Sequence, residues 1–290
     1  MSYNYLEAAR NAMLGEDFSR AIPNLKYLIS DHRLKRNLQT REHYLEALSM
    51  LCNCFMIKQD YTSAAMNYRE ILELEPGDAG SRYSYGVALM HLQHYAEAAD
   101  QFRFVSKSHP GNPDVWHNWA ICLMHQGRFD GAEETLERLL RHVPEHEPGR
   151  ILLGEARRLQ GKYAEAMDAL TRVINARTKD PLAFYYRGLT QYAQEEFEAA
   201  DRDFNQALAL RMETPTLRLY LGNCYGISGD TERSIAHFRR AVEMDPTYLD
   251  AWRNMMIIAN KNGRPEVAKE AAGKVLELAP GNAEAAKILS

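Results

Sequence analysis

The chain has 290 residues, of which 46% are hydrophobic and 26% charged, and its formal net charge at pH 7 is -4. This apolar fraction excludes general disorder, and the acidic balance gives no electrostatic reason to expect nucleic acid or an anionic membrane as partner. No segment approaches the ~18 apolar residues of a membrane span, and the N-terminus lacks the basic and apolar runs of a signal peptide. We therefore expect a soluble, cytoplasmic protein.

The sequence repeats with a period of 34 residues, and the first unit covers 2–35. An insertion over 36–44 separates this unit from the next. It overlaps the most basic stretch of the chain, 32–43. Two interpretations of this stretch stay open: a solvated helix end or connecting loop, since charge runs usually face water, or a docking patch or hinge.

Seven further units follow without a gap, over 45–78, 79–112, 113–146, 147–180, 181–214, 215–248 and 249–282. The clearest is 113–146, in which two amphipathic helices are predicted on either side of a tight turn at Gln126 and Gly127. A fixed period of this size predicts one elongated array over 1–290, in which each unit buries its apolar face against its neighbours.

Positions 8 and 24 of the unit are complementary in size, one small and the other large, as dense packing between two helices requires. Position 8 is small in most units, and Met256 is the one large exception; the others are Cys52, Gly86, Ala120, Gly154, Gly188 and Gly222. Position 24, in the second helix, is mostly bulky, with Tyr68, Phe102, Leu136, Leu170, Phe204 and Phe238. Position 20 of the second helix is Ala or Ser throughout, as in Ala132.

The unit boundaries carry independent helix signals. Prolines that should end the second helices recur at Pro76, Pro110, Pro144, Pro246 and Pro280. Asn112, Asp180 and Thr214 each precede a proline, which predicts a capped first helix. After the last unit, 283–290 begins another helix that can cover the terminal apolar face only in part. Either this helix is a minimal cap or the natural protein continues past Ser290, and we favour continuation.

These residues resemble the tetratricopeptide repeat, a helix–turn–helix with a set spacing of aromatic, small and proline positions. Two units that follow the spacing closely contain Leu221, Gly222, Tyr225, Ser234, Phe238 and Pro246, and Tyr85, Gly86, Tyr95, Ala98, Phe102 and Pro110. The resemblance covers almost the whole chain. It implies an all-α fold, a right-handed α-solenoid (superhelix) of tandem repeats.

The resemblance also implies that the first helices line a concave groove into which positions 2, 5, 9, 12 and 13 project. The helical spacing independently places these positions on one face. The residues that we expect to contact a partner there are Asn53, Met56, Tyr83, Met90, His91, His117, Met124, His125, Arg158, Tyr185, Tyr192 and Asn223.

Position 12 is methionine in four successive repeats, at Met13, Met56, Met90 and Met124. Adaptable thioether side chains in a groove would suit an apolar or amphipathic segment of a partner. The alternative is that these methionines fill the space between neighbouring first helices. Both interpretations stay open.

No metal ion or cofactor is expected. His117 and His125 are separated by about 12 Å along one helix, too far to share an ion, so the groove histidines are polar or pH-sensitive contacts. The four cysteines, Cys52, Cys54, Cys122 and Cys224, are predicted to be buried structural thiols. Some relatives clamp a peptide C-terminal carboxylate with a set of Lys, Arg and Asn residues. Here the basic members of that set are missing, so we do not expect this clamp.

The sequence contains no phosphate-binding loop, paired zinc motif or nucleophile turn, and we expect no enzyme activity in these residues. The leading hypothesis is a scaffold or adaptor that binds a peptide or amphipathic helix of a partner protein in the groove. An alternative is the targeting or substrate-selecting region of a larger enzyme, such as a transferase. RNA binding is opposed by the acidic charge, and self-association stays open. The sequence names neither the partner nor the oligomeric state.

Overall fold

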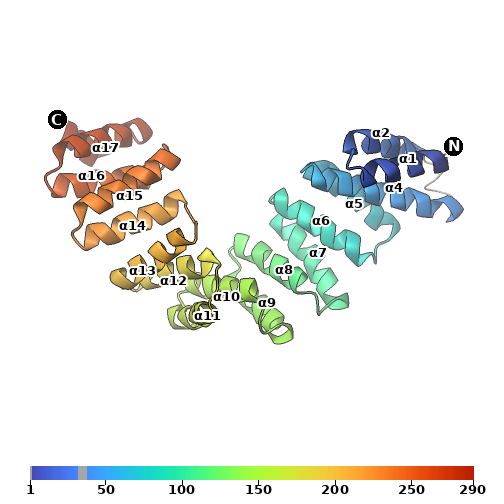
Figure 1. Ribbon diagram of the computed structural model, residues 1–290, viewed down its shortest axis with the longest axis horizontal. Coiled ribbons are helices and arrows are strands. Elements are labelled where there is room, and N and C mark those ends of the chain that lie inside the picture. Colours follow the sequence, from blue (N-terminus) through green and yellow to red (C-terminus); the bar gives the residue numbers. More distant parts are fainter. Residues whose placement is uncertain (1, 32–37) are drawn as a thin grey trace. The chain divides into compact units, whose positions relative to one another are not determined.

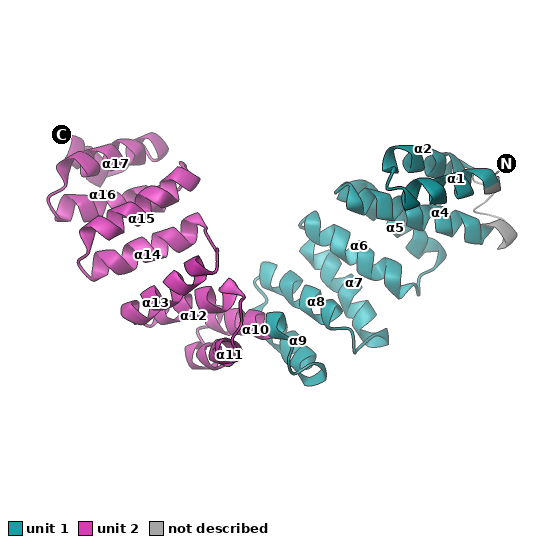
Figure 2. Ribbon diagram, in the orientation of Figure 1, with its two compact units in different colours: residues 1–149 teal, residues 150–290 magenta. Residues whose placement is uncertain are grey.

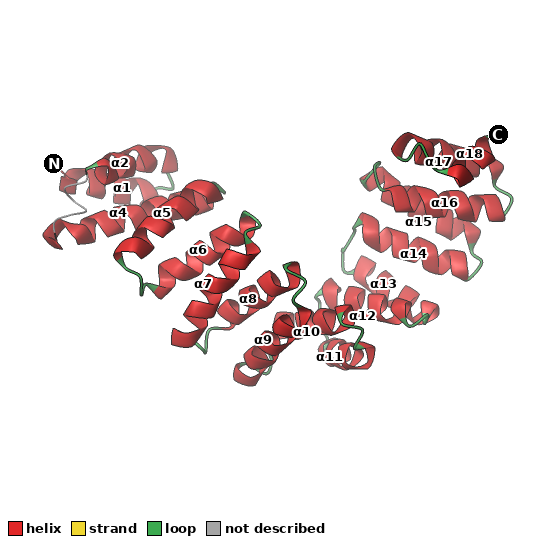
Figure 3. Ribbon diagram, turned by 180° about the vertical axis from the view of Figure 1, so that it is seen from behind, coloured by secondary structure: helices red, strands yellow, loops and turns green. Residues whose placement is uncertain are grey.

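The computed structural model describes residues 2–31 and 38–290 (Figure 1). Within this part of the chain every regular element is an α-helix, and short turns join the helices (Figure 3). The predicted all-α fold of tandem helix–turn–helix repeats is therefore confirmed. The helices group into two compact units, residues 1–149 and residues 150–290 (Figure 2), so the single array predicted over 1–290 stays a prediction.

Unit 1 consists of four helix pairs, counted over its described residues. The helices are α1 (Ser2–Leu14), α2 (Phe18–Ser30), α4 (Leu38–Ile57), α5 (Tyr61–Leu74), α6 (Ala79–His91), α7 (Tyr95–Ser108), α8 (Pro113–His125) and α9 (Phe129–His142). Each first helix packs against its own second helix, and each of the first three second helices packs against the first helix that follows it.

The helices that follow belong to unit 2, although α10 begins three residues before the boundary. They are α10 (Glu147–Leu159), α11 (Tyr163–Asn175), α12 (Pro181–Ala193), α13 (Phe197–Ala209), α14 (Pro215–Ile227), α15 (Thr231–Met244), α16 (Leu249–Lys261), α17 (Pro265–Leu278) and α18 (Ala283–Leu289). The short α18 contacts α17; its Ala285 is buried, whereas Leu289 is 45% exposed.

The prolines and capping residues at the repeat boundaries end and begin the helices as the sequence predicts. Helices α5, α7, α9, α15 and α17 each end two residues before a proline. The side chains of Asn112, Asp180 and Thr214 accept hydrogen bonds from backbone N–H groups in the first turns of α8, α12 and α14. At the turn between α8 and α9, Gly127 has a φ of 69°, a left-handed conformation that glycine adopts without steric cost.

The basic stretch over 32–43 is partly helical. Residues 32–37 lie outside the described residues, but α4 already begins at Leu38, so the end of the predicted insertion extends the first helix of the following pair. Arg41 donates a hydrogen bond to the carbonyl of Leu74 and pairs with Glu75 at 3.8 Å. Residues 38–43 thus lie at the start of a helix, and both interpretations of the role of the stretch stay open.

In each helix pair, a large side chain on one helix packs against a small residue on the other. A Cβ atom added to Gly86, Gly154, Gly188 or Gly222 would lie 2.5–2.8 Å from the side chain at position 24 of the same repeat. These partners, Phe102, Leu170, Phe204 and Phe238, are fully buried. In the last repeat the sizes are exchanged, because buried Met256 at position 8 is accompanied by buried Ala272 at position 24. This exchange accounts for the single exception in the sequence pattern.

The substitution Gly222→Ala tests this close approach. Its Cβ would lie 2.5 Å from Cε1 of Phe238, and this ring is fully buried, so we expect a loss of stability of about 1–3 kcal/mol from overpacking. Gly273→Ala in α17 is the control, because nothing lies within 4 Å of its added Cβ and alanine should stabilise the helix by up to ~1 kcal/mol. Urea unfolding followed by circular dichroism measures both; equal midpoints for the two variants would contradict the packing argument.

Candidate functional site

In unit 1 the predicted groove positions of two successive first helices meet in a pocket. Its volume is about 260 Å³, and its lining residues are Val87, Met90 and His91 of α6, Tyr95 of α7, and Asn118, Ile121 and His125 of α8. The pocket therefore brings together three of the predicted residues, Met90, His91 and His125. Its wall combines apolar side chains with an amide and two imidazoles, and an apolar lining with a few polar groups is typical of ligand pockets.

The two histidines of this pocket are held by the same contact in successive repeats. His91 stacks on Tyr61 with ring centroids 4.0 Å apart, and His125 stacks on Tyr95 with centroids 4.1 Å apart. Each tyrosine belongs to the second helix of the preceding repeat, so the stack joins neighbouring repeats. Both imidazoles are consequently oriented before any ligand arrives, which lowers the entropy cost of binding.

Tyr83 and Asn118 form a polar link between α6 and α8. The amide nitrogen Nδ2 of Asn118 donates a hydrogen bond to the Tyr83 hydroxyl at 3.1 Å. Burial raises the pKa of Tyr83, so the hydroxyl is neutral at physiological pH. With its nitrogen fixed in this way, Asn118 presents its amide oxygen as an acceptor suited to a peptide N–H.

The methionines of position 12 contribute to packing. Met13, Met56 and Met90 are half-buried and pack against the core of unit 1. Met124 is also half-buried. The side chains therefore fill space between helices and still keep accessible surface, and contact with a partner through that surface stays a prediction. Of the four, Met90 lines the pocket.

His117 lies in a more closed environment than the other groove histidines. Its Nδ1 atom is buried without a hydrogen-bond partner, and its ring centroid is 5.7 Å from that of His146. Burial lowers the pKa of His117, with a further lowering by His146. The imidazole is therefore neutral at pH 7. Asn53, by contrast, is exposed.

In unit 2, Arg158 is engaged by a carboxylate of its own helix. Its guanidinium donates two hydrogen bonds to Glu155, at 2.6 and 2.8 Å. Burial alone would lower the pKa of Arg158, but the bonds to Glu155 raise it overall. Burial and the neighbouring Tyr220 raise the pKa of Tyr185. The positive charge of Arg158 is thus balanced by Glu155, and Tyr185 and Tyr220 lie nearby.

In unit 2, Tyr192 of α12 and Asn223 of α14 contact each other across neighbouring first helices. Tyr192 hydrogen-bonds to Asn223, and its ring meets that of Tyr220 edge-on with centroids 5.0 Å apart. Asn223 in turn accepts a hydrogen bond at 2.8 Å from Asn254. Tyr220 also stacks on buried Phe204. The structure therefore forms a second, more aromatic cluster around the predicted groove residues Tyr192 and Asn223 of unit 2.

Several site residues were absent from the sequence prediction. Val87 and Ile121 occupy position 9, the same position as Asn53 and Asn223, so the positional rule could have found them. Tyr95 and Tyr220 carry no such signal. Tyr95 lies at the start of a second helix, and it reaches the pocket through its stack on His125.

All four cysteines are free and buried, as predicted. Burial raises the pKa of the Cys122 and Cys224 thiols to about 12, so neither is a reactive thiolate at neutral pH. Among residues 2–31 and 38–290, no three His, Cys, Asp or Glu side chains form a group able to hold a metal ion. No helix within the same residues has the length and apolar character needed to cross a membrane.

Comparison with protein families gives matches to three sequence profiles, each described as tetratricopeptide repeat. They match residues 93–148, residues 58–113 with 185–248, and residues 151–177. Together these segments cover more than half of the chain.

Relatives of similar sequence include a human protein and cyanobacterial proteins. Tetratricopeptide repeat protein 13 of Homo sapiens is 27% identical over 95 residues, which is 33% of this chain and 11% of that protein. Photosystem I assembly protein Ycf3 of Synechococcus is 31% identical over 94 residues, 31% of this chain and 54% of its own length. Ycf3 of Rippkaea orientalis is 27% identical over 135 residues, 40% of this chain and 78% of its own length. The chain thus spans about a tenth of the human relative and about half of the Synechococcus one.

Solved structures share the fold at low sequence identity. A tetratricopeptide repeat protein from Parabacteroides merdae has a TM-score of 0.68 at 14% identity, over 93% of this chain and 98% of that one. The complex Cut9-Hcn1 gives 0.67 at 15% identity, over 98% of this chain and 54% of that one. YrrB, a tetratricopeptide repeat protein with an unusual peptide-binding site, gives 0.54 at 20% identity, over 65% and 97%. At these identities the likeness establishes the fold alone.

The lowered pKa of His117 predicts a loss of stability in acid. The contribution of the neutral imidazole is fully present above pH ~6.5, the ordinary pKa of histidine. It is lost as the pH falls below that value, because the unfolded chain then binds a proton that the folded imidazole binds less readily. His117→Gln should therefore reduce the difference in urea midpoint between pH ~7.5 and pH ~5.5. His94→Gln, at an exposed position, is the control, and an unchanged difference in His117→Gln would refute the prediction.

Proposed function

We propose that this chain, which belongs to the tetratricopeptide repeat family, is a protein-interaction scaffold that binds a peptide or amphipathic helix of a partner protein on its first helices. The observation that carries the proposal is the pocket between α6 and α8, where predicted groove residues converge. Repeats of this family and relatives named as assembly proteins support a role in protein association.

The chemistry of the pocket fits a segment with both apolar side chains and backbone amides. Val87, Met90 and Ile121 offer apolar surface, and the thioether of Met90 adapts to side chains of different shape. The oxygen of Asn118 can accept a backbone N–H, while the stacked His91 and His125 fix the two sides. An extended peptide or one face of a helix would satisfy both kinds of contact.

The aromatic cluster of unit 2 also lies on first helices and offers a second candidate contact surface. Tyr192 and Tyr220 are rigid side chains with a hydroxyl, a kind of residue enriched at binding hot spots. We propose it as a contact surface for the same class of partner. The hypothesis of a substrate-selecting region in a longer enzyme stays a prediction, as do a cytoplasmic location and a partner other than nucleic acid.

A double substitution in unit 1 tests the proposal. Met90→Glu with Met124→Glu places two carboxylates on the apolar face, and we expect it to abolish capture of the partner because a charge cannot be desolvated there without cost. Met66→Glu is a control with one added carboxylate, since Met66 is 68% exposed on the second helix α5. Partners are isolated from native lysate with each protein and identified by mass spectrometry, and their affinities are then measured with purified proteins.

Folding of the variants is checked by circular dichroism. If the double variant is unfolded, His91→Glu with His125→Glu replaces it, because both histidines are exposed and line the same pocket. Equal affinity of a folded groove variant and the wild type for the partner would show that binding does not use the first-helix face of unit 1.

A further inference from the structure

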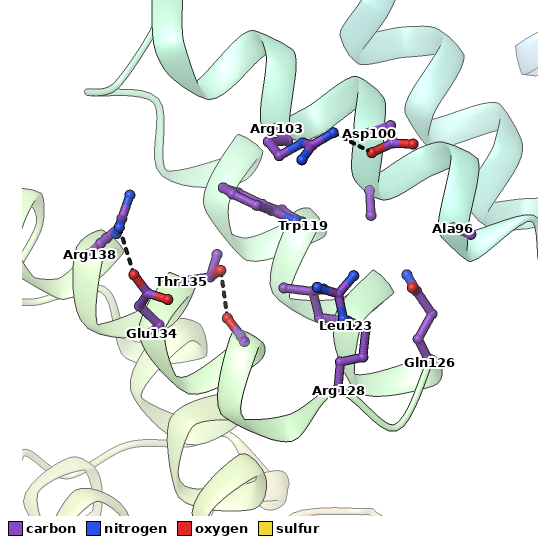
Figure 4. A pocket seen from close by; sticks show the side chains of 12 residues that line it. Ala96, Asp100, Arg103, Trp119, Leu123, Gln126, Arg128, Glu134, Thr135 and Arg138 are labelled. Carbon is purple, nitrogen blue, oxygen red and sulfur yellow. Dashed lines mark hydrogen bonds and ion pairs between the residues drawn. The ribbon is translucent and has the colours of Figure 1, made fainter.

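A second concave surface lies in unit 1, between the second helices α7 and α9. It consists of two pockets of about 280 and 580 Å³, which share Arg103, Trp119 and Arg138 and therefore form one continuous cleft. We call it the second-helix cleft. Figure 4 shows its first part, with Trp119 of α8 between Arg103 on one side and Arg138 on the other.

Helix α8 contributes to both sites with different faces. Asn118, Ile121 and His125 line the pocket between the first helices, whereas Trp116 and Trp119 line the second-helix cleft. Because residues three or four apart share a face of a helix and these two sets are offset, they point to different sides of α8. Occupation of one site therefore leaves the other accessible.

The cleft is basic in a chain that is acidic overall. Five basic side chains line it, namely Arg103, Lys107, Arg128, Arg138 and Arg141, against two acidic ones, Asp100 and Glu134, while the formal net charge of the whole chain is -4. This local reversal of sign is a surface feature that the overall composition conceals. It creates a positive potential that attracts anionic groups.

Part of this positive charge has no internal partner. Arg103 pairs with Asp100 at 2.8 Å and Arg138 with Glu134 at 2.6 Å, but all four side chains are at least 48% exposed, and such surface pairs are weak. Within the described part of the chain, no acidic side chain pairs with Lys107, Arg128 or Arg141. These three are available to a ligand.

The floor of the cleft is aromatic. Trp116 is 6% exposed and its indole N–H donates to the carbonyl of Pro110 at 2.8 Å, so this ring is fixed. The half-buried Trp119 ring stacks on it with a centroid distance of 5.7 Å and faces both parts of the cleft. A rigid indole of this kind provides contact surface for an apolar side chain between the charged walls.

We propose that the second-helix cleft binds a short acidic segment of a partner protein, with carboxylates on Lys107, Arg128 and Arg141 and an apolar side chain on Trp119. Arginine binds carboxylates through paired N–H groups. Basic side chains without an acidic partner lie at both ends of the cleft and match negative charges spaced along a peptide. A single-stranded nucleic acid fits less well. Successive bases stack on a series of exposed aromatic faces, whereas Trp116, the second indole of this cleft, is only 6% exposed.

The test uses the full chain and a fluorescein-labelled peptide of sequence EEDLFEEDE, with QQNLFQQNQ as the uncharged probe. We expect the wild type to bind the acidic peptide and not the uncharged one, with affinity falling between about 50 and 300 mM salt. Lys107→Glu with Arg141→Glu should weaken binding at least about tenfold, as reversal of two contacting charges requires. The neutral pair Lys107→Gln with Arg141→Gln should give an intermediate loss.

Two controls separate this site from net charge and from the first-helix pocket. Arg20→Glu with Lys269→Glu changes the net charge equally at two exposed positions outside the cleft and should bind like the wild type. Met90→Glu with Met124→Glu should also bind the acidic peptide normally. Thermal melts followed by circular dichroism establish that each variant is folded, which is expected because Lys107 and Arg141 are exposed.

Three results would overturn the proposal. The first is equal affinity of the wild type and the charge-reversed variant for the acidic peptide. The second is tighter binding of a dT oligonucleotide through the same two residues, which would assign the cleft to nucleic acid. The third is a dimer of the wild type that the charge reversal dissociates, which would make a second copy of the chain the occupant.

Discussion

The close approach of the two helices in each pair is the constraint on which the rest of the structure depends. Where a glycine at position 8 faces a buried phenylalanine or leucine at position 24, a single added carbon would overlap the partner side chain. The first helix is thereby held at a fixed distance from the second. Every residue on its outer face is then positioned by backbone packing, so that the pocket side chains need little further ordering.

This rigid spacing gives α8 two surfaces. One side meets α6 through the hydrogen bond between Asn118 and Tyr83, and the other supports Trp119 between α7 and α9. The chemistry of the two sides differs: the first is apolar with fixed imidazoles and an amide, the second is basic over an aromatic floor. Under the two proposals, a single helix would serve two partners with unlike sequences, without competition for the same side chains.

Most of the fold follows from the sequence because the period repeats local physical signals. Prolines, capping side chains and the pairing of Gly222 with Phe238 recur at set positions, and the helices begin and end where these signals predict. The pocket between α6 and α8 follows in part from the same periodicity, which selects Met90, His91 and His125. Tyr95 could not be selected in this way, since its contact with His125 joins two repeats through a second helix. The second-helix cleft escaped prediction because Arg103 and Arg138 resemble ordinary solvated charges until α7 and α9 are brought side by side.

The exchanged sizes in the last repeat limit how freely this chain can be rearranged. Repeat arrays grow by duplicating or swapping units, and most pairs here combine a small first-helix residue with a large second-helix one. A hybrid pair of α16 with α15 would press Met256 against Phe238, whereas a hybrid of α14 with α17 would leave a void between Gly222 and Ala272. The pair α16 and α17 can therefore be exchanged only as a whole. Recombination between its two helices would be selected against even where the 34-residue register is kept.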